Sequence, residues 1–194
     1  MDRTRKYGTQ YRDFRTDHLN RYRFAAEYLE GGSVLDAACG CGYGAKLLDE
    51  AGYVVTGTDI FDSAILWAKE YFPGPDYAVC DIESRLPIGD YDAVASFETL
   101  EHLVNPERAL INFRLVAKRL IASVPNEDVW PFDKEHFASD DYPHQRHYTP
   151  RQFEQLLESA GWEVVDRFTQ EGNRKPHTQV VEGTHGKFII YGCR

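Results

Sequence analysis

Short apolar runs alternate along this chain with stretches in which apolar residues recur every three or four positions. The apolar runs are typical of buried strands, and several of them end at an acidic residue, a glycine turn or a proline. They predict strands over residues 33–38, 53–59, 77–81, 91–96, 120–124, 162–168 and 187–191.

Helices are predicted in the amphipathic stretches between these strands. Residues 43–51 form one, and the others begin at side chains suited to capping a helix. Ser63 precedes the segment that Pro73 breaks, Asn105-Pro106 opens the next, and Thr149 with Gln152 has the spacing of a capping box.

Strands that alternate with helices predict a doubly wound α/β fold with a parallel sheet. We expect seven strands, the last two forming an antiparallel pair at one edge. In such sheets ligands bind beyond the carboxyl ends of the strands, near the point where the strand order reverses. The residues that follow the first four strands are therefore the candidates for chemistry.

The composition is that of a globular protein and sets limits on its function. The chain has 194 residues, 42% of them hydrophobic and 13% aromatic, so we expect one domain over residues 1–194. The net charge of −9 disfavours a nucleic-acid partner without excluding it. No apolar stretch approaches the ~20 residues of a membrane span. Four cysteines without a CxxC pair suggest reduced thiols, and we expect a cytoplasmic protein.

Residues 1–30 differ from the rest of the chain in their charge. The first 23 residues hold seven basic and three acidic side chains. We interpret this segment as a solvated basic arm or helix; an arm that contacts the substrate is the alternative.

The turn after the first predicted strand carries a strong sequence signal for ligand binding. Gly40, Gly42 and Gly44 allow a ligand to approach the backbone closely at the start of a helix. The glycines alone also fit a nicotinamide cofactor. Asp36 favours a different ligand, because a carboxylate there would repel a pyrophosphate and would suit an ammonium group.

Two further acids end the second and third predicted strands. Asp59 lies 19 residues beyond Gly40, the usual arrangement for an acid that binds two ribose hydroxyls. Asp81, followed by Ile82, would complete an adenosine pocket if its carboxylate accepted from the exocyclic amine and the isoleucine lay under the purine.

With these residues the chain resembles the class I S-adenosylmethionine-dependent methyltransferases. The matching segments are residues 34–44, 57–60, 80–82, 91–102 and 123–126, which span most of the chain in the right order. The resemblance implies S-adenosylmethionine as cofactor, with Phe97 and Glu98 beside the methyl-transfer point. The cofactor contacts predicted in this way are Asp36, Ala37, Gly40, Gly42, Asp59, Ile60, Asp81, Ile82, Phe97 and Glu98. One departure is the absence of a glycine turn at residues 116–119, which we interpret as a trimmed turn.

Candidate acid–base residues occur in two places. Glu98, Glu101 and His102 share one face if their segment is helical. Residues 126–148 form a long connection, interpreted as a substrate loop or lid, and contain His144 and His147. We expect a histidine among His102, His144 and His147 to accept the proton, with Glu101 shaping the pocket and orienting the base.

A metal-dependent reading uses some of the same residues. Glu98, Glu101, His102 and His147 resemble the metal site of small-RNA 3′-end 2′-O-methyltransferases, and the Glu-x-x-Glu-His pattern also occurs in ubiquinone-pathway O-methyltransferases. Such a set would hold Mg²⁺ or Mn²⁺ against a hydroxyl. Many relatives with Glu-His at this place use no metal.

The favoured function is methyl transfer to an oxygen of a small metabolite or of a sugar or glycan. Residues 144–149 and 18–25 resemble small methyltransferases found with sugar and polysaccharide biosynthesis. The rivals are an RNA 3′-end methyltransferase, an NAD-dependent oxidoreductase and a catalytically silent cofactor-binding module. The oxidoreductase is disfavoured by Asp36 and by the lack of a recognisable Tyr-x-x-x-Lys pair.

Overall fold

The computed structural model describes residues 7–87, 89–137, 142–172 and 178–194. They form one mixed sheet in the order β3-β2-β1-β4-β5-β8-β6-β7, with helices on both faces. The strands are β1 (Ser33–Ala37), β2 (Val54–Asp59), β3 (Asp76–Val79), β4 (Tyr91–Phe97), β5 (Ala117–Pro125), β6 (Val164–Gln170), β7 (Val181–Glu182) and β8 (Phe188–Cys193). The helices are η1 (Tyr11–Asp13), α1 (Thr16–Tyr28), α2 (Tyr43–Glu50), α3 (Asp62–Tyr71), α4 (Pro106–Val116), α5 (Lys134–Phe137) and α6 (Pro150–Ser159).

The strand directions show which edge of the sheet is expected to bind a ligand. Strands β1 to β5 run parallel, and β8 pairs antiparallel with both β5 and β6. The chain order reverses between β1 and β4, so ligands are expected at the carboxyl ends of these two strands. The predicted doubly wound sheet is confirmed, with β7 as an eighth strand of only two residues.

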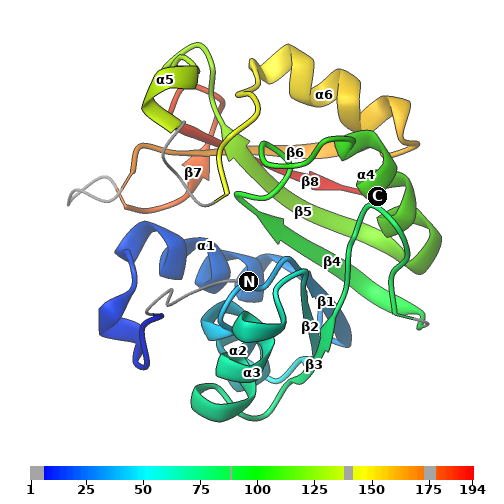
Figure 1. The fold of residues 1–194 in the computed structure, drawn as a ribbon. Coiled ribbons are helices and arrows are strands. Elements are labelled where there is room, and N and C mark those ends of the chain that lie inside the picture. Colours follow the sequence, from blue (N-terminus) through cyan, green and yellow to red (C-terminus); the bar gives the residue numbers. More distant parts are fainter. Residues whose placement is uncertain (1–6, 88, 138–141, 173–177) are drawn as a thin grey trace.

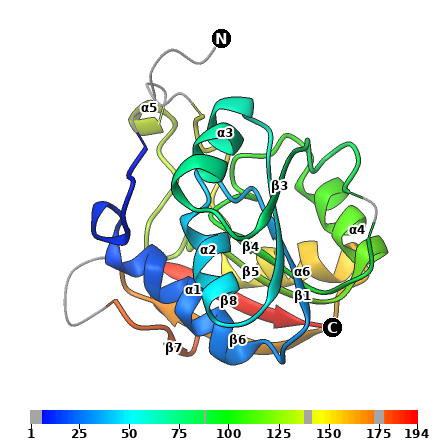
Figure 2. The same ribbon diagram turned by 90° about the horizontal axis from the view of Figure 1, so that it is seen from below.

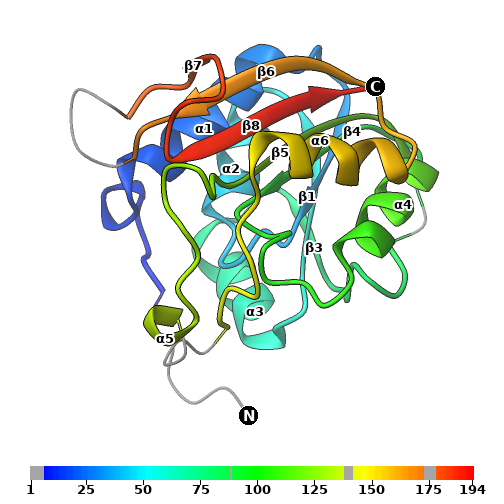
Figure 3. The same cartoon turned by 90° about the horizontal axis from the view of Figure 1, so that it is seen from above.

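Two hydrophobic cores lie on opposite faces of the sheet. Helices α1, α2 and α3 pack on one face, and α4 and α6 cover the other (Figures 1, 2 and 3). Trp162 is buried in the second core and its indole N–H donates to the carbonyl oxygen of Leu110 at 3.0 Å. This bond satisfies the one polar group of a large apolar side chain.

The predicted caps of α4 and α6 are confirmed, and that of α3 is wrong. Asn105 accepts a hydrogen bond from the backbone of Arg108, and Thr149 and Gln152 form both bonds of a capping box. Helix α3 begins at Asp62 with no side-chain cap, and Ser63 lies within its first turn. The turn at residues 116–119 is trimmed completely, since α4 ends at Val116 and β5 begins at the next residue.

Two further findings concern membranes and thiols. Among the described residues, no helix combines the length and the apolar character that crossing a bilayer requires. All four cysteines are free thiols, three of them buried.

The contact between α1 and α2 yields a test of the packing. Gly44 lies in α2 against Tyr22, and an added Cβ would fall 2.0 Å from the tyrosine Cζ. Gly44→Ala is therefore expected to lower the free energy of unfolding by about 1–3 kcal/mol, measured by urea denaturation. Gly89→Ala is the control, because its nearest contact would be at 3.3 Å and it should change stability by less than about 0.5 kcal/mol. Equal midpoints for the two variants would contradict this packing.

Candidate cofactor and acceptor site

Two cavities lie side by side at the carboxyl ends of β1, β2 and β4. The first, of about 200 Å³, is lined by residues from the ends of β2 and β3 and from the turn after β4. The second, of about 280 Å³, is lined by residues of α1, the loop after β1 and the end of β4. They share Tyr7, Ala38, Gly40 and Glu98, so one elongated ligand can occupy both.

The loop after β1 connects this strand to α2 through a turn that requires glycine. Gly40 has a φ of 56° and Gly42 a φ of 89°, values that residues with a Cβ rarely adopt. A Cβ on Gly42 would lie 2.6 Å from that of Ala68, whereas a Cβ on Gly40 would meet nothing within 4 Å. Gly42 is thus needed for packing on α3, and Gly40 leaves the backbone open toward the cavities.

Asp59 holds this loop against the end of β2. One carboxylate oxygen accepts from the backbone N–H of Gly40 and the other from that of Phe61, each at 2.9 Å. The side chain lines the first cavity and is almost completely buried. Its place at the end of β2, on the cavity wall, is the usual one for a carboxylate that accepts from the hydroxyls of a ribose.

The other predicted adenosine contacts also lie at this cavity. Ile60, Asp81 and Ile82 all line it. Asp81 accepts from the backbone of Glu83 at 3.0 Å and from the hydroxyl of Ser84 at 2.7 Å.

Asp36 lies deeper than expected for a residue that touches the ligand. It is fully buried at the end of β1, does not line either of these cavities, and accepts from the hydroxyl of Tyr22 at 3.0 Å. Burial raises the pKa of Asp36 to about 7, against the opposing effect of the tyrosine bond. Tyr22 lines the second cavity, so Asp36 acts on it through this hydroxyl. Ala37 is buried and away from both cavities as well.

Arg21 of α1 is a site residue that the sequence analysis missed. It is 1% exposed, so the prediction of a solvated basic arm is wrong here. Its Nη1 lies 2.8 Å from Oε1 of Glu98, its Nη2 3.6 Å from Asp17, and its guanidinium 4.5 Å from the ring centroid of Phe188. Arg21 lines the second cavity. The spacing of Asp17 and Arg21 could have indicated a paired arginine, because it places a carboxylate one helical turn before Arg21.

Glu98 is held in a strained conformation at the end of β4. Its φ of 51° is unusual for a residue with a side chain. Ser123 of β5 donates to Oε1 of Glu98 at 2.9 Å, beside the bond from Arg21. Burial raises the pKa of Glu98, and the Arg21 charge opposes the rise. Strain of this kind persists where surrounding contacts fix a side chain, which is frequent at functional sites.

The segment before α1 forms a strap across α2 and α3. Gly8 accepts through its carbonyl from the indole of Trp67 at 3.1 Å, and Phe14 stacks on Tyr43 at 4.0 Å. The strap brings Tyr7 to both cavities. Residues 1–6, the start of the predicted arm, lie outside the described residues.

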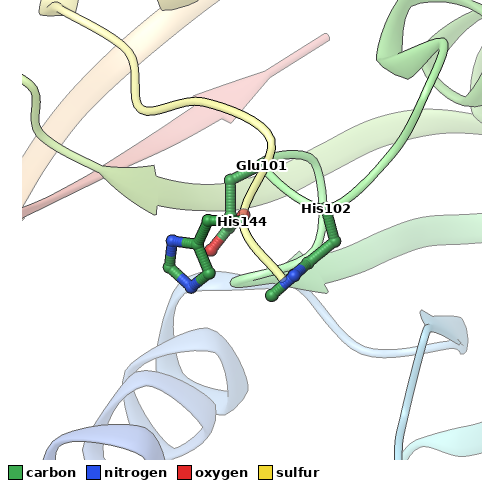
Figure 4. A group of neighbouring side chains, drawn as sticks. All are labelled: Glu101, His102 and His144. Atoms are coloured by element: carbon green, nitrogen blue, oxygen red, sulfur yellow. The ribbon is translucent and has the colours of Figure 1, made fainter. Parts of the chain in front are cut away.

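Glu101, His102 and His144 gather on the acceptor side of the cavities (Figure 4). Each offers one oxygen or nitrogen atom, and these atoms lie within 4.8 Å of one another. Glu101 is fully buried, and neither of its carboxylate oxygens has a hydrogen-bond partner among the described residues. Burial raises the pKa of Glu101 well above its usual value, and the nearby Glu98 adds to the rise. His102 lines the first cavity and stacks on Tyr142.

The predicted lid, residues 126–148, is anchored at both ends. Asn126 donates through its side-chain amide to the carbonyl oxygens of Thr184 and Gly186, and Gln145 donates from its backbone to the carbonyl of Glu101 at 2.7 Å. Inside the lid the rings of Phe137 and His144 stack at 4.1 Å. Residues 138–141 lie outside the described part of the chain. The lid therefore brings His144 to the residues that follow β4.

Two members of the predicted metal set, His147 and Glu98, have other partners. Its Nδ1 lies 2.6 Å from the carbonyl oxygen of Trp130 and its Nε2 lies 2.8 Å from Nδ1 of His144. Glu98 is occupied by Arg21 and Ser123. The structure thus brings His144, rather than Glu98 and His147, together with Glu101 and His102.

Comparison with known proteins identifies the family. The family model described as "Methyltransferase domain" matches residues 7–167. The chain belongs to the S-adenosylmethionine-dependent methyltransferases. This match decides against the nicotinamide reading of the glycine loop, and the S-adenosylmethionine predicted as cofactor is supported by the family.

The curated relatives are named as methyltransferases and are longer than this one. A probable S-adenosylmethionine-dependent methyltransferase of Mycolicibacterium smegmatis is 29% identical over 153 residues, which are 75% of this chain and 57% of the relative. A ubiquinone biosynthesis O-methyltransferase of Methylocella silvestris is 35% identical over 99 residues, which are 48% of this chain and 39% of that enzyme. This methyltransferase thus matches 57% of the length of the first relative and 39% of that of the second.

Solved structures share the fold. A methyltransferase of Thermotoga maritima, described as a possible histamine N-methyltransferase, has a TM-score of 0.75 at 19% identity, covering 92% of this chain and 90% of that one. Magnesium protoporphyrin IX methyltransferase of Synechocystis, solved with S-adenosylhomocysteine, has a TM-score of 0.63 at 20% identity, covering 92% and 80%. At these identities the likeness concerns the fold alone.

The hydrogen bonds of Asp59 yield a binding test. In Asp59→Asn an amide –NH₂ replaces one oxygen and cannot accept from a backbone N–H, so the loop or the α3 turn loses its anchor. We expect the affinity for S-adenosylhomocysteine to fall about 10–100-fold by calorimetry, the effect of one charged hydrogen bond. Asp62→Asn, at an exposed position in the first turn of α3, should bind within about twofold of the parent. Parent-like binding by Asp59→Asn would remove Asp59 from the cofactor site.

Proposed function

We propose that this protein transfers the methyl group of S-adenosylmethionine to an oxygen of a small metabolite or of a sugar or glycan hydroxyl. The observation that carries the proposal is the junction of the two cavities with the Glu101–His102–His144 group. His102 lines the first cavity, and Glu98 lines both. A cofactor site and a set of proton acceptors therefore meet at one edge of the sheet.

In the proposed complex the adenosine occupies the first cavity and the methionine part the second. Asp59 accepts from the ribose hydroxyls, while Ile60 and Ile82 provide apolar surface for the purine. Arg21 supplies positive charge for the carboxylate of the methionine part, and Asp36 acts on its ammonium group through Tyr22. This assignment puts the sulfonium near Phe97 and Glu98, where the cavities meet the acceptor side.

The transfer needs alignment and the removal of one proton. The acceptor oxygen forms a bond to the methyl carbon as the bond between that carbon and sulfur breaks, leaving a neutral thioether. His102, which lines the cavity, takes the hydroxyl proton in the proposed mechanism. Glu101 offers a carboxyl oxygen within 4.8 Å of a His102 ring nitrogen, and in the proposed mechanism it orients the imidazole. This role would account for a buried carboxyl group with no hydrogen-bond partner among the described residues.

A small acceptor is favoured over a nucleic acid. Arg21, one of the basic residues of the N-terminal segment, is buried and paired with Glu98, so its charge is not presented on the surface to a polyanion, and the net charge is −9. The lid lies against the acceptor side and its aromatic rings suit a ring-shaped acceptor. Free thiols agree with the reducing cytoplasm as the compartment.

The proposal is tested by binding and turnover together. Calorimetry should show binding of S-adenosylhomocysteine and none of NAD. Release of S-adenosylhomocysteine from S-adenosylmethionine is then measured with catechol and with methyl glucoside as acceptors. His102→Gln should bind S-adenosylhomocysteine within about threefold of the parent and lose about 10²–10⁴-fold in turnover, the usual contribution of a general base.

The exposed His136 of α5 provides the matched control, and His136→Gln should keep parent turnover. Undiminished turnover in His102→Gln would eliminate it as the base. Binding without turnover on either acceptor would favour the silent module, and methylation of an RNA 3′ end in the same assay would favour the RNA enzyme.

A metal-assisted variant of this reaction is the second candidate, because Glu101, His102 and His144 have a suitable spacing. Two imidazoles with one carboxylate favour Mn²⁺ over Mg²⁺, which prefers oxygen ligands. Such an ion would lower the pKa of the acceptor hydroxyl. The fit rests on the two unpartnered oxygens of Glu101 within the described residues.

This candidate predicts direct Mn²⁺ binding. Titration with Mn²⁺, followed by the paramagnetic resonance signal of the free ion, should show one bound equivalent. In Glu101→Gln the loss of the only anionic ligand should weaken binding by at least tenfold. Glu135→Gln, at an exposed lid position, should bind as the parent does. If the parent leaves all added Mn²⁺ free, the metal variant is discarded and the proton goes to His102 directly.

A further inference from the structure

The lid contains a directed chain of hydrogen bonds that ends at His144. It starts at the backbone carbonyl of Trp130, whose oxygen lies 2.6 Å from Nδ1 of His147. A carbonyl oxygen only accepts hydrogen bonds. Nδ1 of His147 therefore carries a hydrogen and donates it.

The next contact joins two imidazoles. Nε2 of His147 lies 2.8 Å from Nδ1 of His144, a distance at which one nitrogen donates and the other accepts. If His147 is neutral, its single hydrogen is already on Nδ1, so Nε2 is the acceptor. His144 then donates from Nδ1, and its remaining nitrogen, Nε2, carries no hydrogen.

The surroundings favour the neutral form of both rings. His147 lies 4.7 Å from the ring of Trp130 and 5.4 Å from that of Phe137, and Phe137 also stacks on His144. Lys187 places its ammonium 3.6 Å from the centroid of the Trp130 ring.

Two groups face Nδ1 of His147, the carbonyl oxygen of Trp130 at 2.6 Å and the carboxylate of Glu127 at 4.0 Å. Both favour a hydrogen on Nδ1, which leaves Nε2 as the acceptor of the neutral ring. The carboxylate of Glu127 also accepts from the backbone N–H of Phe132, so it has a donor other than His147.

We propose that His147 is a positioning residue that fixes His144 as its Nδ1–H tautomer, so that the unprotonated Nε2 of His144 is offered to Glu101 and His102. His144 groups with Glu101 and His102, with ligand atoms that lie within 4.8 Å of one another, and the tautomer decides which of its ring nitrogens keeps a free lone pair there. This role in turnover rests on the proposed function, whereas the tautomer is a property of the resting protein.

The tautomer is measured without any acceptor or cofactor. Two-bond ¹H–¹⁵N correlation spectra of protein labelled at histidine nitrogen distinguish protonated from unprotonated ring nitrogens. We expect His144 to show a protonated Nδ1 and an unprotonated Nε2, and His147 to show the same pattern. A protonated Nε2 on His144, or rapid exchange between its two tautomers, would overturn the proposal.

Two substitutions separate positioning from packing. His147→Phe fills the space but cannot accept from His144, so the Nε2 signal of His144 should move toward the protonated range. His147→Gln can accept through its side-chain oxygen and should restore the parent signal. His136→Gln, elsewhere in the lid, should leave the signal unchanged. A parent-like His144 spectrum in His147→Phe contradicts the proposed role.

Turnover with catechol or methyl glucoside gives the functional readout. We expect kcat to fall about 10–100-fold in His147→Phe, with an unchanged KM for S-adenosylmethionine, and to recover in His147→Gln. Equal losses in both variants would show that His147 serves packing alone. If the parent binds no S-adenosylhomocysteine, the proposed function fails, and the spectra of the resting protein still decide the tautomer.

Discussion

The ion pair between Arg21 and Glu98 connects the parts of the molecule on which the site depends. Arg21 comes from α1, Glu98 from the end of β4, and Ser123 of β5 donates to the same carboxylate oxygen. Two charges removed from water are costly unless they are paired and hydrogen-bonded, so these elements are held in one arrangement. That arrangement fixes the left-handed turn at Glu98 and thereby the position of the residues that follow it.

Two distant segments complete the site from opposite sides of this pair. The strap before α1 brings Tyr7 to both cavities, and the lid brings His144 to Glu101 and His102. The strap accepts through the Gly8 carbonyl from the indole of Trp67 in α3, whereas the lid donates from Asn126 and Gln145 to backbone carbonyls of other segments. The cofactor side is consequently built from the loops of the parallel sheet, and the acceptor side from a long connection packed through aromatic rings.

The sequence was most informative where a local pattern has one structural solution. The glycine loop and Asp59 follow buried strands, and parallel strands place their carboxyl ends at one edge. The start of β5 was missed because Lys118 and Arg119 are exposed at its beginning. The pairing of Tyr91 with Ala117 and of Ala93 with Arg119 extends the strand there. The two residues of β7 carry too little pattern to be recognised.

The sequence by itself determined the fold class, the methyltransferase family and the chain positions around the cofactor. These features arise from the periodicity of apolar residues and from short segments that need no distant partner. Only the tertiary structure decided which charges are buried and which histidines meet. Arg21 pairs with Glu98, and His147 donates to the Trp130 carbonyl, whereas His144 lies beside Glu101. The sequence could not show these contacts, because burial and hydrogen-bond direction depend on elements that are far apart in the chain.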